Sequence, residues 1–108
     1  MLEPKILKPG DTLTLVQIYH ASGQRVEIKG SIVPSDDAGE YDFSGVQERY
    51  AFGKDVERTV GLLDIEVSGA NRGSPRLHTF NMGGVDVTGT IENLPRNEGI
   101  RFTPVQQI

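Results

Sequence analysis

RLHTFNMGGVDVTGTIENL, residues 76–94, is the stretch that decides the fold. Two runs with alternating polar and apolar side chains flank the pair Gly83-Gly84. Glycine adopts the positive φ angles of a two-residue hairpin turn without steric cost. Because alternate side chains of a strand point to opposite faces, the second run predicts a hairpin whose apolar side needs other strands to cover it. That side carries Val85, Val87, Gly89 and Ile91.

The rest of the chain repeats this pattern of short extended runs and turns. It has 13 glycines and 6 prolines in 108 residues, which is typical of many short elements joined by turns. Residues 12–21 and 24–33 predict a hairpin around residues 22–23, and residues 41–43 predict an extended segment. Residues 100–105 predict a last strand with Ile100 and Phe102 facing inward. Short connections favour antiparallel pairing. We therefore expect an all-β fold, a mostly antiparallel sandwich or small barrel of roughly seven or eight strands.

Two segments fit both a helix and a strand. In residues 44–52, Val46 and Tyr50 have helical spacing, but the same segment also alternates as a strand does. Residues 56–63 carry both patterns as well, and their β-branched content favours a strand over residues 57–68. A short helix near residues 44–52 stays an alternative.

Length and composition indicate a single domain. A chain of 108 residues buries roughly two-thirds of its unfolded surface, which is enough for one core, and residues 1–9 are expected to form an extended arm. The absence of cysteine excludes disulfides and thiolate metal sites. It also favours a cytoplasmic location, as does an N-terminal segment without signal-peptide character. No apolar run approaches the roughly 20 residues of a membrane-spanning helix.

One short segment resembles a known structural feature. Residues 37–43 read DAGEYDF. They resemble the tyrosine corner of immunoglobulin domains, in which Asp-Ala-Gly-x-Tyr-x-Cys opens a late strand. Phe43 stands where that family has its disulfide cysteine, and the chain has no tryptophan. The resemblance implies a turn that feeds a strand, with the Tyr41 hydroxyl hydrogen-bonded back to the turn.

Four carboxylates lie close together in one polar loop. Calcium prefers about six to eight oxygen ligands, often from neighbouring loop carboxylates. The spacing does not match an EF-hand loop, and acidic residues also favour turns for local reasons. We therefore expect a solvated turn and no cofactor, and keep as metal-ligand candidates Asp36, Asp37, Glu40 and Asp42.

The two histidines, His20 and His78, are the candidates for catalysis. Each lies in a predicted strand beside apolar neighbours and could act as a general base next to Asp64, Asp86 or Glu92. The chain contains no Gly-x-Ser-x-Gly nucleophile elbow. We interpret both histidines as strand residues and expect no enzymatic site.

Charge is unevenly distributed along the chain. The net charge is −4, which argues against binding to a nucleic-acid backbone. Residues 67–85 nevertheless contain no acidic side chain and include Arg72, Arg76 and His78. Segregated charge can steer an anionic ligand or a second copy of the protein, so these three are the predicted binding residues.

These observations favour a non-enzymatic β domain that acts as a protein-binding or assembly module. It would bind a protein partner or associate with itself as a homodimer, for example through an edge strand. The alternative is a pocket for a small ligand, such as a carbohydrate, or a small enzyme that uses a strand histidine. Neither nucleic acid nor a membrane is expected as a partner.

Overall fold

The computed structural model describes residues 3–19, 21–62 and 77–107, and they form an all-β fold. One antiparallel sheet contains all the strands of this part of the chain, in the order β1-β8-β7-β6-β2-β3-β4-β5. The elements are β1 (Lys5–Leu7), β2 (Leu13–Ile18), β3 (Arg25–Pro34), β4 (Tyr41–Ala51), β5 (Lys54–Gly61), β6 (Leu77–Met82), β7 (Val85–Asn93), a 3-10 turn (Pro95–Asn97) and β8 (Ile100–Gln107).

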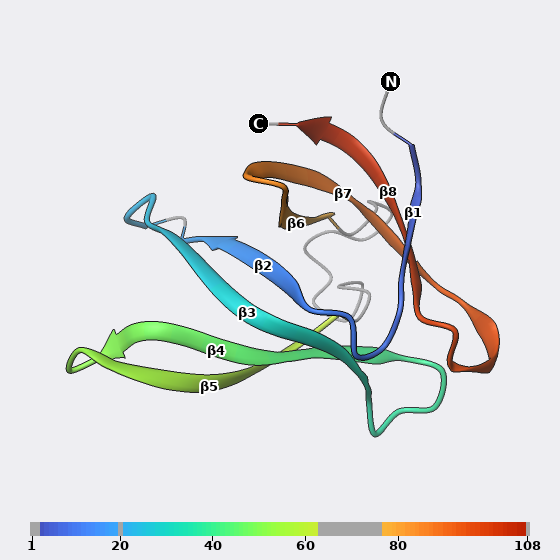
Figure 1. The fold of residues 1–108 in the computed structure, drawn as a ribbon, viewed down its shortest axis with the longest axis horizontal. Helices are drawn as coiled ribbons and strands as arrows, with labels where there is room; N and C mark the ends of the chain where they lie inside the picture. The colour runs from blue at the N-terminus through green and yellow to red at the C-terminus, as the bar shows by residue number, and fades with distance from the viewer. Residues whose placement is uncertain (1–2, 20, 63–76, 108) are drawn as a thin grey trace.

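The sheet curls over so that its two halves face each other. Strands β1, β7 and β8 lie on one side, and β3, β4 and β5 lie on the other (Figure 1). The sheet does not close into a barrel, because β1 and β5 remain as its two edges. The predicted all-β, antiparallel architecture is confirmed. The described residues contain no helix with the length and apolar character needed to span a membrane.

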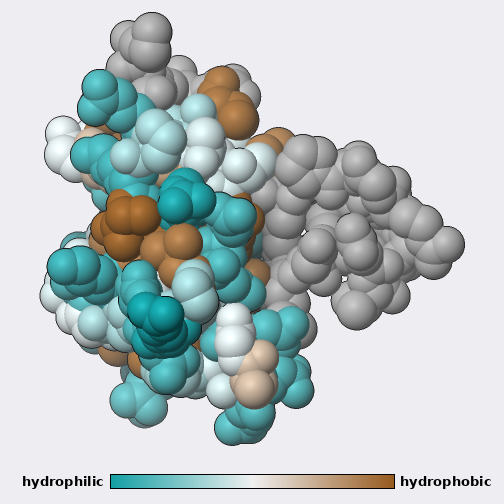
Figure 2. All heavy atoms as spheres, turned by 90° about the vertical axis from the view of Figure 1, so that its right-hand side faces the viewer, coloured by the Kyte–Doolittle hydropathy of each residue, from teal (hydrophilic) through white to brown (hydrophobic). Residues whose placement is uncertain are grey.

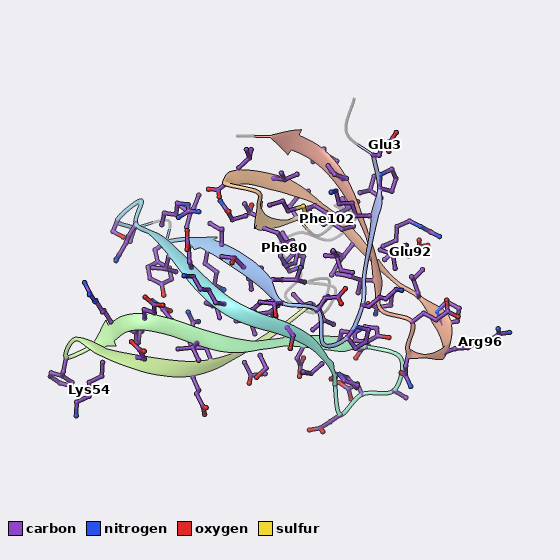
Figure 3. All side chains as sticks on the ribbon, viewed as in Figure 1. Glu3, Lys54, Phe80, Glu92, Arg96 and Phe102 are labelled. Atoms are coloured by element: carbon purple, nitrogen blue, oxygen red, sulfur yellow. The ribbon has the colours of Figure 1, made fainter. Side chains whose placement is uncertain are left out.

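The core lies between the two halves and is built around three aromatic rings. Phe43, Phe80 and Phe102 are completely buried and come from β4, β6 and β8. The rings of Phe43 and Phe80 are 6.3 Å apart, and those of Phe80 and Phe102 are 5.2 Å apart in an edge-to-face arrangement. Figure 3 shows Phe80 and Phe102 inside the fold, between its two sides. Such pairs add about 0.5–1.5 kcal/mol to the stabilisation from burial.

A pair of glycines allows β3 and β4 to approach each other closely. Gly30 and Gly45 are directly opposite each other in the ladder. A Cβ atom on Gly30 would collide with the carbonyl oxygen of Ser44, and one on Gly45 would collide with that of Lys29. The two backbones therefore approach at a distance that only glycine permits.

The hairpin around Gly83-Gly84 is confirmed. The two glycines have φ angles of 62° and 87°, and Met82 pairs with Val85 across the turn. The inward position of Ile100, predicted from alternation, is also confirmed, since this residue is fully buried. The alternation of polar and apolar residues was sufficient to predict these features because one face of each strand packs on the core.

The helix alternative for residues 44–52 is wrong. Strand β4 continues to Ala51 and pairs with β3 on one side and β5 on the other. Two sets of ladder hydrogen bonds outweigh the local helical spacing. Strand β5 begins at Lys54, before the predicted start, and ends at Gly61. The predicted continuation over residues 63–68 lies outside the described residues.

The expected hydrogen bond of Tyr41 is also corrected. The Tyr41 hydroxyl accepts a hydrogen bond from the backbone N–H of Gly99 at 2.9 Å, not from its own turn. The Tyr41 ring is buried and reaches across the core to the segment before β8. The turn closes by itself, since the Glu40 N–H donates to the Asp37 carbonyl at 3.2 Å.

Part of the predicted N-terminal arm belongs to the sheet. Residues Lys5–Leu7 form β1 and pair with β8. The side of the molecule that carries β1 and the β7–β8 turn is mostly hydrophilic, with apolar patches between the polar groups (Figure 2).

Candidate functional site

The β2–β3 and β4–β5 hairpins separate at one end of the sheet (Figure 1). The last described pair of the β3–β4 ladder joins Lys29 to Val46, although β3 begins at Arg25. The resulting groove, which we call the cleft, has a volume of about 340 Å³ and lies between the start of β3 and the end of β4. The residues that line it include Tyr19, Gln47 and Tyr50.

An irregularity in β4 turns this strand away from β3. The register of β4 against β5 shifts between Gln47 and Ala51. Within this interval, Arg49 has a φ of 53°, and its backbone N–H donates to Asp55 Oδ1 at 3.2 Å. A non-glycine residue in this conformation costs about 1–3 kcal/mol, so the surrounding contacts must hold it there. The divergence of the hairpins is therefore fixed by the bulge.

The edge of β3 that faces the cleft is open. The Tyr19 N–H donates to the Gln24 carbonyl at 3.0 Å, which sets the hydrogen-bonding phase of β3. Because backbone groups alternate in direction along a strand, Val26 turns its N–H and C=O toward β2, whereas Arg25 and Glu27 turn theirs toward the cleft. No strand of the described chain pairs with this side of Arg25 and Glu27.

Arg25 forms an ion-pair network on the outer face of the sheet. Its Nε and Nη2 atoms donate to the two carboxylate oxygens of Asp86, each at 2.7 Å, and Nη1 donates to Glu27 at 2.7 Å. The hydrogen bonds to Asp86 and then to Glu27 raise the pKa of Arg25, and the hydrogen bond from Arg25 lowers the pKa of Asp86. Val16, on β2 between these strands, is buried on the same face.

Arg58 forms a different cluster on the inner face. Its Nη1 atom donates to Gln17 Oε1 at 3.0 Å and to Gln47 Oε1 at 2.7 Å. Gln47 is only 4% exposed. The guanidinium carbon of Arg58 lies 6.0 Å from the centre of the Tyr50 ring. Arg58 therefore joins β2, β4 and β5, and its partners among the described residues are neutral amide oxygens.

The Arg58 cluster borders a second groove, which we call the inner groove. It has a volume of about 570 Å³, and Tyr19, Arg58, Val60 and His78 are among the residues that line it. Tyr19 also lines the cleft, and Gln47 lines the cleft while it binds Arg58. The cleft and the inner groove are therefore neighbours that meet at the Arg58 cluster.

The β4–β5 hairpin ends in an exposed aromatic tip. Phe52 and Gly53 form its two-residue turn, with φ angles of 52° and 72°, and Ala51 pairs with Lys54. Figure 3 shows Lys54 at this tip, far from the core rings. The Phe52 side chain is fully exposed, at 101%. A bulky residue with positive φ is uncommon, and here it also presents its ring to solvent.

The structure places one of the predicted binding residues at these grooves. His78 lies on β6 opposite Gly89 and lines the inner groove with Arg58. Arg72, Arg76 and the catalytic candidate His20 lie outside the described residues. Asp86 pairs with Asn81, which lies an odd number of residues after His78 on β6. Because side chains alternate between the two faces of a sheet, Asp86 and His78 are on opposite faces.

The acidic candidates lie in and beside the loop between β3 and β4. Burial first, and then the neighbouring charges of Asp37 and Asp42, raise the pKa of Glu40. Within the described ranges, no group of three histidine or carboxylate side chains is arranged to hold a metal ion. Asp36, Asp37, Glu40 and Asp42 are therefore not gathered into such a group.

Sequence reasoning missed Gln47 and Arg58. The signal was present, because Arg58 has the same alternation phase as Val56 and Val60, which face inward on β5. A charged residue at an inward position points to a polar cluster or a binding site. Comparison with family models, with curated proteins and with solved structures finds no match.

Proposed function

We propose that this domain is a non-enzymatic protein-binding module that accepts an extended segment of a partner protein in the cleft. The observation that carries the proposal is the open edge of β3, where Arg25 and Glu27 direct backbone groups toward a groove. A partner strand there would add to the sheet, with main-chain hydrogen bonds giving affinity and alternate side chains giving specificity.

The expected affinity is modest. Each backbone hydrogen bond contributes about 0.5–1.5 kcal/mol net, and the two residues of the open edge offer a short ladder. The aromatic side chains of Tyr19 and Tyr50 at the cleft supply additional contact area. The Phe52 ring at the hairpin tip is a further anchor, since exposed aromatic residues on a fixed backbone dominate many interfaces.

The edge strand β5 is poorly suited to homodimer formation. It carries Lys54, Asp55, Glu57 and Arg58. Antiparallel pairing of two β5 strands about a two-fold axis through Glu57 or Arg58 would place that charged residue opposite its own copy. Like charges directly opposite each other are destabilising, and charged edge strands are a known protection against sheet association. A different protein is therefore the better partner.

The test uses proline to remove a single hydrogen-bond donor. Because the Glu27 N–H faces the cleft, Glu27→Pro removes that donor but none of the N–H groups that bond β3 to β2. Short random peptides are selected by display on the wild-type protein, and binding of a selected peptide is measured by fluorescence anisotropy. We expect Glu27→Pro to weaken binding by about tenfold.

Glu27→Ala is the matched control. It loses the same ion pair with Arg25 but keeps the backbone N–H, so the selected peptide should bind it within about twofold of wild type. Thermal melting checks that both variants fold. The proposal is overturned if no peptide is selected, or if the proline and alanine variants bind the selected peptide equally well.

A further inference from the structure

We infer that Arg58 forms a carboxylate-binding site where the inner groove meets the cleft. A guanidinium group has a planar fork of N–H donors that matches the two oxygens of a carboxylate. In the described chain, the hydrogen bonds of Arg58 to other side chains come from Nη1 alone and go to Gln17 and Gln47. The other nitrogens of the fork are thus available to a ligand in the groove that Arg58 lines.

Arg25 shows how this protein satisfies an arginine for structural purposes. All three guanidinium nitrogens of Arg25 donate to carboxylates, two of them to Asp86 and one to Glu27. The described partners of Arg58 hold the guanidinium without neutralising it. An arginine that only joined strands would be satisfied as Arg25 is, whereas Arg58 keeps its charge for another group.

The site is organised before a ligand arrives. Gln47 is almost fully buried and is fixed in the ladder opposite Val56, while Gln17 is fixed in β2 opposite Val26. Both amide oxygens accept hydrogen bonds from the same nitrogen atom, Nη1 of Arg58, and these two bonds orient the guanidinium plane. The guanidinium carbon also lies over the Tyr50 ring, 6.0 Å from its centre. A preorganised group loses less freedom on binding, so more of its interaction energy appears as affinity.

The ligand class follows from the charge and size of the site. Arg58 is a cation whose side-chain hydrogen-bond partners are neutral, so it attracts an anion locally although the net charge of the chain is −4. A single guanidinium balances the single charge of a carboxylate, and the groove of about 570 Å³ accommodates a small organic acid or the end of a peptide. If the cleft holds an extended segment, as proposed above, its C-terminal carboxylate or an acidic side chain could reach Arg58.

The primary test does not depend on the proposed function. Propionate is titrated into the labelled full chain, and the Nε–Hε resonance of Arg58 is followed by NMR, with propionamide and inorganic phosphate as comparison ligands. We expect a saturable shift with propionate, little shift with propionamide and weaker binding of phosphate. The inference is overturned if propionate gives no saturable shift, or if propionamide or phosphate binds as tightly.

Variants locate the binding. Arg58→Lys keeps the charge but loses the planar fork and should weaken propionate binding about tenfold, followed on the amide resonances around Gln47. Gln17→Ala should weaken it less, because it removes one orienting contact. Arg101→Gln is the matched control, since Arg101 pairs with Glu92 away from the grooves, and it should bind as wild type does. Equal binding by Arg58→Lys and wild type would overturn the inference.

A second set of peptides separates the sources of the carboxylate. The display-selected peptide is compared with a free and an amidated C-terminus, and with its acidic side chains replaced by amides. Loss of affinity in one arm identifies the carboxylate that Arg58 binds. Glu27→Pro should weaken these peptides but leave propionate binding unchanged, so a failure of the strand proposal and a failure of the Arg58 site give different results.

Discussion

The core region and the splayed end of the sheet are held together by different kinds of contact. In the core region, the Phe43, Phe80 and Phe102 rings are completely buried, and the Phe80 ring contacts both of the others. At the splayed end, the hairpins are joined by the polar Arg58 cluster, and Phe52 is fully exposed. The difference indicates that stability is concentrated in the core region, so that the splayed end can be varied without unfolding the domain.

The largest effect is expected for Phe80→Ala. The Phe80 ring contacts both other rings of the core, and its removal leaves a cavity that the curled sheet cannot fill. We expect a loss of about 3–5 kcal/mol in the free energy of unfolding, measured by urea denaturation. A loss below about 1 kcal/mol would show that the core region does not carry the stability.

Tyr41→Phe tests the polar bond within the core region. The substitution keeps the buried ring but removes the hydroxyl that accepts the Gly99 N–H. A buried donor without an acceptor costs about 1–3 kcal/mol, and the Gly99 amide should exchange faster with solvent. Tyr50→Phe is the control, since Tyr50 is 54% exposed, and it should change stability by less than about 0.5 kcal/mol.

Sequence periodicity predicted the core region well because each of its strands packs one face against the same core. The Gly83-Gly84 turn and the inward positions of Ile100 and Phe102 follow from alternation alone. The splayed end could not be predicted in this way. Its shape depends on the bulge at Arg49. A bulge inserts extra residues into one strand, so the alternation of inward and outward side chains no longer continues in the same phase beyond it.

Long-range contacts were also beyond sequence reasoning. Arg25 and Asp86 are 61 residues apart, and Tyr41 and Gly99 are 58 apart. Nothing in the local pattern of either partner specifies the other, because the contact exists only once the strand order is fixed. The resemblance of residues 37–43 to a tyrosine corner accordingly named the right hydroxyl but the wrong partner.

Acid should weaken the Arg25 network, at the border between the two regions, before it affects the core rings. Hydrogen bonding to Arg25 lowers the folded-state pKa of Asp86 below its unfolded value, about 3.9. The ion pair therefore stabilises the fold above about pH 4, and this contribution is lost as the pH falls through the folded-state pKa. Because Arg25 is 38% exposed, we expect about 1 kcal/mol or less.

The measurement compares the pH dependence of urea unfolding between wild type and Asp86→Asn. The difference in stability should be constant from about pH 5 to 7 and should shrink below about pH 4. The comparison with the variant is necessary because Glu40, whose pKa is raised, acts in the opposite direction. A difference that stays constant to low pH would show that Asp86 does not titrate as its contacts require.

The smallest effect, and the one of opposite sign, is expected at the hairpin tip. Phe52 and Gly53 occupy a turn in which both φ angles are positive, and Asn-Gly is the sequence that such a turn favours. Phe52→Asn should therefore stabilise the domain by roughly 0.5 kcal/mol, because asparagine adopts this conformation more readily and no buried contact of the ring is lost. Differential scanning calorimetry at fixed pH measures the change. If Phe52→Asn instead lowers the melting temperature, the ring stabilises the fold, and its exposure is no argument for a binding role. If Phe52→Asn raises the melting temperature but weakens binding of the selected peptide, then the chain keeps an unfavourable turn residue because Phe52 contacts a partner.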